Sequence, residues 1–125
     1  MSEIKKSIVA KVLYTTTDST LIGYLPAGAF IEGINVSIET AFNAGGNDYL
    51  QIGTSTDEDA FGDDINVGTK DIVLVDVPSA GIGILSTTVP TGIYVDYQPA
   101  GSAPTAGVAY VVITYVQPIA QTTGF

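Results

Sequence analysis

The sequence predicts an all-β fold, specifically an antiparallel β-sandwich of jelly-roll type with about eight strands. Short runs rich in Val, Ile, Thr and Tyr recur at intervals of about 8 to 14 residues. The 14 glycines and six prolines punctuate these runs, with Gly33 as a bulge. No window keeps the apolar spacing of an amphipathic helix over three turns. An immunoglobulin-like sandwich is the nearest alternative, but its paired cysteines and buried tryptophan are absent.

The sequence of the first quarter of the chain predicts an arm that is followed by two strands. Residues 1–6 form a short N-terminal arm. Residues 7–17 form a strand in which Val9, Lys11 and Leu13 share one face. The opposite face of that strand consists of Ile8, Ala10, Val12 and Tyr14. Residues 21–25 form a second, short strand, which ends at the turn containing Pro26 and Gly28.

Residues 30–53 predict two strands joined as a hairpin by a glycine-rich turn. Ile34, Val36 and Ile38 alternate with polar residues, as expected for a strand with one face in a core. The turn contains two glycines and Asx residues, which tolerate positive φ and bond to their own backbone. Leu50 and Ile52 then resume the apolar face.

The middle of the chain predicts a long loop over residues 55–70, then a strand over residues 71–77. Residues 82–88 form another short strand before the turn at Pro90. Residues 93–98 alternate again, so their strand is half-buried, with an apolar face made of Ile93, Val95 and Tyr97.

The last strand, residues 108–116, is apolar on both faces. Ala109, Val111, Ile113 and Tyr115 alternate with Val108, Tyr110, Val112 and Val116. An antiparallel sandwich needs only one apolar face per strand. The second face is therefore covered either by another layer of the same domain or by a neighbouring subunit. Residues 117–125 form an extended tail, because Pro118 cannot donate to a ladder, and residues 1–125 make a single β-sandwich domain.

The composition excludes several classes of function. The chain has no His, Cys, Arg or Trp, which removes the usual general base, thiol chemistry and bidentate phosphate clamps. Glu32 and Glu39 point to opposite faces of one strand, so they make no catalytic pair. The net charge of −9 opposes binding to nucleic acid or anionic membranes, and no apolar run reaches the length of a transmembrane helix. We expect neither an enzyme nor a bound cofactor.

Low charge combined with high hydropathy predicts self-association or binding to other subunits. Only 14% of the residues are charged, whereas 46% are hydrophobic. This is too little charge to cover the surface of a monomer, so part of the apolar area is expected to lie against other subunits.

An acidic cluster in the long loop is the strongest candidate for a metal site. Its carboxylates suit the oxygen preference of calcium, but their spacing does not fit an EF-hand. The alternative is a solvated loop held open by charge repulsion, in which Phe61 anchors the loop on the core or on a neighbour. We expect no metal, and the weak candidate ligands are Asp57, Asp59, Asp63 and Asp64.

Two segments resemble small structural proteins of tailed bacteriophages, namely capsid decoration (cement) proteins. The first runs from Val36 to Gly46 and continues through residues 50–57 to Phe61. The second runs from Tyr97 to Gly107 and leads into residues 111–115. The resemblance covers about half of the chain. It implies a β-sandwich or jelly-roll subunit that binds the outside of a capsid as a dimer or trimer, with no catalytic residues.

The expected function is therefore that of a virion structural protein on the capsid exterior, made in the host cytoplasm, with the major capsid protein and its own copies as partners. A tail-fibre or receptor-binding module that recognises a surface glycan through tyrosines and the acidic loop is the alternative. The expected partner-binding residues lie in the acidic loop, the last strand and the two arms: Phe61, Asp59, Lys5, Lys6, Tyr115, Ile119 and Phe125.

Overall fold

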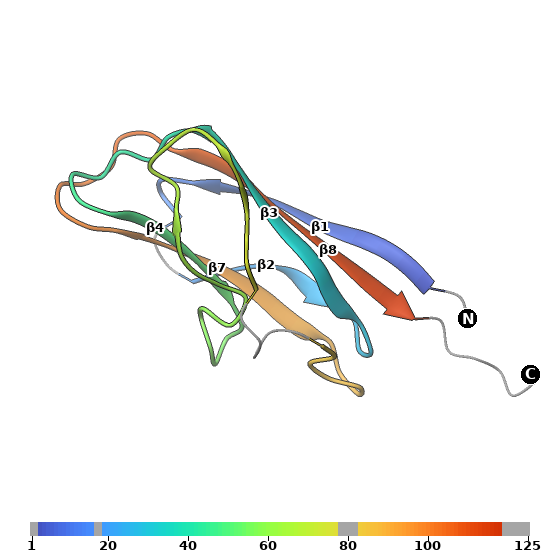
Figure 1. The fold of residues 1–125 in the computed structure, drawn as a ribbon. Helices are drawn as coiled ribbons and strands as arrows, with labels where there is room; N and C mark the ends of the chain where they lie inside the picture. The colour runs from blue at the N-terminus through green and yellow to red at the C-terminus, as the bar shows by residue number, and fades with distance from the viewer. Residues whose placement is uncertain (1–2, 17–18, 78–82, 119–125) are drawn as a thin grey trace, which may run out of the picture.

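The computed structural model describes residues 3–16, 19–77 and 83–118, which form two four-stranded antiparallel sheets (Figure 1). One sheet has the strand order β1-β8-β3-β6 and the other β2-β7-β4-β5. Within the described ranges no residue is helical. The strands are β1 (Glu3–Leu13), β2 (Thr20–Leu25), β3 (Phe30–Thr40), β4 (Asp48–Gly53), β5 (Gly62–Asn66), β6 (Ile72–Leu74), β7 (Thr91–Pro99) and β8 (Val108–Pro118).

The strand pairing is that of a jelly roll. The first strand pairs with the last, β2 with β7, β3 with β6 and β4 with β5, all antiparallel. These four pairs follow the pattern of one long hairpin that is folded over. The additional pairs β3–β8 and β4–β7 join the strands into two sheets. The predicted all-β jelly-roll sandwich with eight strands is confirmed.

The predicted hairpin over residues 30–53 is wrong. Both strands exist, but β3 lies between β8 and β6 in one sheet, and β4 lies between β7 and β5 in the other. Residues 41–47 therefore cross from one sheet to the other. The turn residues show only that the chain changes direction, and the alternating pattern fits any strand with one buried face.

Three further boundaries differ from the sequence prediction. The segment 55–70 was expected to be a loop, yet it contains the strand β5, which its polar sequence GDDIN does not indicate. Residues 83–88 form bends rather than a strand, and Ile82 lies outside the described residues. The strand expected at 71–77 is reduced to the three residues of β6.

Strand pairing extends into both segments that were expected to be arms. β1 begins at Glu3, β8 ends at Pro118, and these two residues face each other in the register. Residues 1–2 and 119–125 lie outside the described residues.

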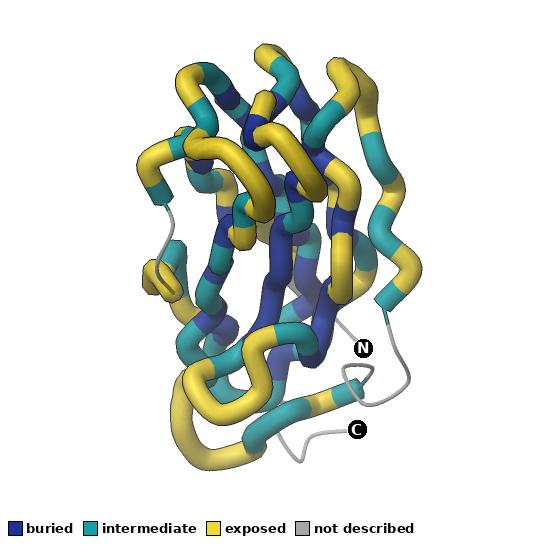
Figure 2. Tube along the Cα trace, turned by 90° about the vertical axis from the view of Figure 1, so that its left-hand side faces the viewer, coloured by how far each residue is buried: buried dark blue, intermediate teal, exposed yellow. Residues whose placement is uncertain are grey.

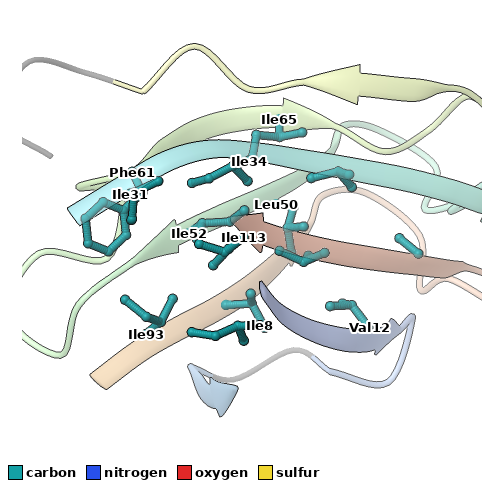
Figure 3. Close-up of a cluster of buried hydrophobic side chains, with 14 of the residues drawn as sticks. Ile8, Val12, Ile31, Ile34, Leu50, Ile52, Phe61, Ile65, Ile93 and Ile113 are labelled. Carbon is teal, nitrogen blue, oxygen red and sulfur yellow. The ribbon is translucent and has the colours of Figure 1, made fainter. Parts of the chain in front are cut away.

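The core lies between the two sheets and is formed by the inward faces of their strands (Figures 2 and 3). The predicted alternation is confirmed in β1, where Ile8 and Val12 are buried while Val9 is exposed. β3 follows the same rule with Ile34, Val36 and Ile38 inward. Figure 3 shows side chains from both sheets meeting in this layer: Ile8, Val12, Ile31, Ile34, Leu50, Ile52, Phe61, Ile65, Ile93 and Ile113.

Candidate interaction surfaces

The outer face of the β1-β8-β3-β6 sheet is apolar over much of its area. Two cross-strand rows define it, each running from β1 through β8 and β3 to β6. One row is Val9, Val112, Asn35 and Leu74, and the other is Lys11, Tyr110, Ser37 and Ile72. Val9 is 63% exposed, Ile72 67% and Leu74 77%. We call this surface, with Leu13 and Val108 at its edge, the apolar sheet face.

The two-sided apolar pattern predicted for β8 explains this surface. Val111 and Ile113 point inward and are fully buried against the other sheet. Tyr110 and Val112 point outward and remain half-exposed. One face of β8 is therefore covered by the domain's own second layer, and the other lies open on this chain.

A shallow groove of about 610 Å³ opens on the same side of the molecule, beside β6. Tyr110 and Ile72 supply apolar walls, and Lys70, Glu39 and Asp71 supply charges at its rim. The amide of Ile38 donates to the carbonyl of Asp71 at 2.8 Å and joins β3 to the segment before β6.

The apolar sheet face is close to electrically balanced, whereas the rest of the protein is strongly acidic. Among the side chains that the structure describes, the charges on and beside this face are Lys5, Lys11, Lys70, Glu32, Glu39, Asp71 and Asp76, the last of which follows Leu74 on the same side of the chain. Lys5 and Glu32 form an ion pair at 3.3 Å. Elsewhere, among the described side chains, a single lysine, Lys6, stands against seven acidic residues, which are Asp48, Asp57, Glu58, Asp59, Asp63, Asp64 and Asp96.

The acidic loop is anchored on the protein's own core. Phe61 is fully buried, and its amide donates to the carbonyl of Ile52 at 2.9 Å. Gly53 fits the loop closely, because a Cβ there would lie 2.1 Å from the Asp57 carbonyl oxygen. Of the two positions that the sequence left open for Phe61, the core is the one observed.

The loop carboxylates interact without forming a cation site. A hydrogen bond with the Asp57 carboxyl raises the pKa of Asp59, and desolvation and the charge of Asp63 raise it further. Asp64 instead exchanges two hydrogen bonds with Gln51, at 2.7 and 3.0 Å. Over the part of the chain that the structure describes, no group of three or more His, Cys, Asp or Glu residues is placed to hold a metal ion.

The predicted partner-binding residues are only partly brought together. Lys5 and Lys6 are exposed near the start of β1. The chain direction places them at the same end of the sandwich as the β2–β3, β4–β5 and β6–β7 connections, hence as Asp59 (Figure 1). We call this the terminal end. Tyr115 is only 7% exposed, and Ile119 and Phe125 lie outside the described residues.

Sequence reasoning missed the exposed apolar side chains of Val9, Ile72 and Leu74. The sequence does carry a signal for them. Apolar residues stand at alternate positions on the solvent-facing side of the first strand and of the strand near residue 72. Without the sheet order, however, nothing in the sequence showed that these side chains share one surface.

A buried polar contact fixes the opposite end of the sandwich. The carboxylate of Asp48 accepts hydrogen bonds from the Tyr97 hydroxyl and, at 2.9 Å, from the Ala44 amide. Burial and the Asp48 carboxylate raise the pKa of Tyr97 well above its ordinary value. This contact holds the β3–β4 connection against β7, so the glycine-rich turn is framework rather than a site.

The β3–β4 and β7–β8 connections are further joined by hydrogen bonds. The Asn43 side chain accepts from the amides of Thr105 and Ala106 at 2.7 and 3.0 Å. The Gly46 amide donates to the Ala100 carbonyl at 2.7 Å. The two segments on which the phage resemblance rests therefore meet in space.

Comparisons with known proteins find the same fold in bacteriophage capsids. One chain of the cyanophage Pam1 capsid asymmetric unit matches with a TM-score of 0.69 and 20% identity, covering 93% of this chain and 86% of that one. A chain of the acidic stable capsid of the Helicobacter pylori bacteriophage KHP30 matches with a TM-score of 0.68 and 11% identity, covering 94% of both chains. No protein-family model matches the sequence, and no curated protein matches it. At these identities the likeness shows a shared fold.

Proposed function

We propose that this chain is a non-enzymatic virion structural protein of the capsid decoration (cement) type. In this proposal it binds the outside of a bacteriophage capsid as a small oligomer and stabilises contacts between major capsid subunits. The observation that carries the proposal is the match, over at least 93% of this chain, to chains from two phage capsids. The resemblance of residues 36–61 and 97–115 to decoration proteins supports it independently.

The physical properties of the surface fit a protein that works in contact with other subunits. The apolar sheet face exposes side chains that a soluble monomer normally covers. Most of the remaining surface is acidic, which suits an outer position away from packaged DNA and disfavours nucleic acid as a partner. Over the described ranges, the structure has no helix with the length and apolar character needed to span a membrane.

We assign the contact with the major capsid protein to the terminal end. Lys5, Lys6 and Asp59 combine charges of both signs there. The predicted contacts through Ile119 and Phe125 lie outside the described residues. Phe61 supports this contact indirectly by holding the acidic loop in place.

The proposed mechanism is burial of surface across the seam between neighbouring capsomers. About 1,000 Å² buried per copy gives a modest affinity for one site. Repeated over a symmetric shell, and with each oligomer bound at more than one point, the same contacts resist separation of the capsomers through multivalency.

Co-sedimentation with expanded shells tests the proposal. Shells of the phage that carries this gene, stripped of this protein, are mixed with micromolar protein and pelleted. We expect saturable binding, weakened by Lys5→Gln with Lys6→Gln. The matched control, Thr15→Glu with Asn47→Asp, makes the same charge change on exposed residues at the opposite end and leaves binding unchanged. Absence of wild-type protein from the pellet contradicts the proposal.

A receptor-binding module is the second candidate. The outer face of the β2-β7-β4-β5 sheet favours it, because Tyr49 and Tyr94 lie there with Asp96 and Gln98, a combination that suits a sugar. A glycan array with and without a calcium chelator separates the two candidates. Glycan or host-cell binding without any shell supports the module, and calcium dependence supports a role for the acidic loop.

A further inference from the structure

We propose that the apolar sheet face joins two copies of this chain face to face in a two-fold symmetric dimer. The inference deepens the proposed function by naming the contact that makes the small oligomer. Only the role of the dimer in a shell rests on the proposed function. The dimer itself forms without a shell.

The two outer faces of the sandwich differ in polarity. On the β2-β7-β4-β5 sheet, polar side chains occupy the centre, with Gln51 opposite Asp96 and Tyr49 opposite Gln98. On the β1-β8-β3-β6 sheet, apolar side chains run from Val9 on one edge to Leu74 on the other. An exposed apolar patch of this kind marks a contact with another molecule.

The charge of this face favours a second copy as its occupant. A chain with a net charge of −9 repels its own copies at most orientations. The apolar sheet face is the exception, because three lysines stand against four carboxylates there, and Lys5 is already paired with Glu32. Two copies can therefore approach through this face with little repulsion, whereas a strongly acidic or strongly basic partner gains little from it.

The charges at the two edges of this face are placed so that those of one copy can pair with those of a second copy. Lys11 lies on β1 at one edge of the sheet, and Asp71 precedes β6 at the other. Lys11 and Ile72 belong to the same cross-strand row. A two-fold axis parallel to the strands lays β1 of one copy over β6 of the other. Lys11 of each copy then lies opposite Asp71 of the other copy, so the same contact occurs twice, as an isologous interface requires.

The area of this face is close to what a stable dimer needs. Eleven-residue strands such as β1, β3 and β8 are about 36 Å long, and four strands span about 19 Å. Allowing for the short β6, the face projects roughly 600 Å² before its corrugation is counted. This approaches the surface of about 800 Å² that each partner buries in a stable interface of standard size.

Sedimentation equilibrium of the purified full chain, without shells, tests the dimer. We expect a dimer at micromolar concentration that is weakened roughly a hundredfold by Val9→Asp or Leu74→Asp, because both copies then bury charges in the contact. Val89→Asp is the matched control, since Val89 is 57% exposed and lies off this face, and it leaves the dimer intact. Thermal melting checks that each variant folds.

Charge exchange tests the orientation. Lys11→Asp and Asp71→Lys each weaken the dimer, and the two combined in one chain restore it. A monomeric wild type, or an oligomer that survives both Val9→Asp and Leu74→Asp, overturns the inference, and a double variant no better than the single ones overturns the two-fold arrangement. A monomer that still pellets with shells overturns this inference alone, whereas a dimer that does not pellet contradicts only the proposed function.

Discussion

The ring of Phe42 packs edge-on against the ring of Tyr97, with centroids 4.7 Å apart and an interplanar angle of 65°. Both residues are almost fully buried, and they are contributed by the β3–β4 connection and by β7. The pair therefore links a connection between the two sheets to a central strand, and it sits beside the hydrogen bond from Tyr97 to Asp48.

Replacing Phe42 by Leu should lower the free energy of unfolding by about 1 to 3 kcal/mol, since the edge contact is lost and the smaller side chain leaves a void. Urea denaturation measures the change. Phe30→Leu is the control, because Phe30 is only half-buried and should cost clearly less. Equal losses for the two variants would mean that the contact with Tyr97 adds nothing.

The hydrogen bond between Tyr97 and Asp48 should make the free energy of unfolding depend on pH in the alkaline range. The pKa of Tyr97 in the folded protein is raised above its ordinary value of 10.0, so the folded state holds this proton more tightly than the unfolded state. The stabilisation is complete below about pH 10 and declines above it, by at most about 1.4 kcal/mol per pH unit.

Tyr97→Phe tests this dependence. Urea midpoints of the wild type and the variant should differ most at neutral pH, because the variant leaves a lone pair of the buried Asp48 without its donor. The difference should shrink as the pH rises above about 10. A gap that stays constant across this range would show that Tyr97 does not titrate with folding.

Gly107→Ala should destabilise the fold strongly. Gly107 has a φ of 155°, and a Cβ there would lie 2.5 Å from the ring of Phe42. Neither the backbone nor the buried ring can move freely, so we expect a loss of about 2 to 3 kcal/mol in thermal or urea unfolding. At Gly33 a Cβ meets nothing within 4 Å, and Gly33→Ala should change stability by less than about 1 kcal/mol.

Asp59→Asn should raise the melting temperature at neutral pH. The folded-state pKa of Asp59 is raised above 3.8, so its stabilising contribution is present below that pH and is lost as the pH rises through the folded-state pKa. The amide removes the repulsion while it can still bond to Asp57. The advantage should disappear at about pH 3, where Asp59 is protonated. Glu58→Gln, one residue away, should show a smaller effect.

The sequence predicted the fold class well because alternation records which side of a strand faces the core. Ile8 and Val12 are buried and Val9 is exposed, as the alternating pattern requires. Local sequence does not show which strands pair with each other, and the predicted hairpin over residues 30–53 was wrong for that reason. β3 and β4 are adjacent in the chain, yet each is paired with strands from distant parts of the sequence.

The candidate surfaces were predictable only in part. The exposed lysines near the start of β1 and the buried anchor at Phe61 followed from local patterns. The apolar sheet face did not, because it is assembled from single side chains on four strands whose order is set by long-range pairing. β5 was missed since GDDIN has too few apolar residues to indicate a strand.

The pairing of β1 with β8 also constrains how the chain is made. Of the eight described strands β8 is synthesised last, yet it occupies the centre of its sheet between β1 and β3. Before β8 has left the ribosome, β1 and β3 have no common neighbour, and their apolar residues have nothing to close against. The domain therefore has a high contact order, and its folding should be slow and should wait until β8 has emerged. Truncation of the last strand would leave β1 as an unpaired, aggregation-prone segment rather than a smaller folded unit.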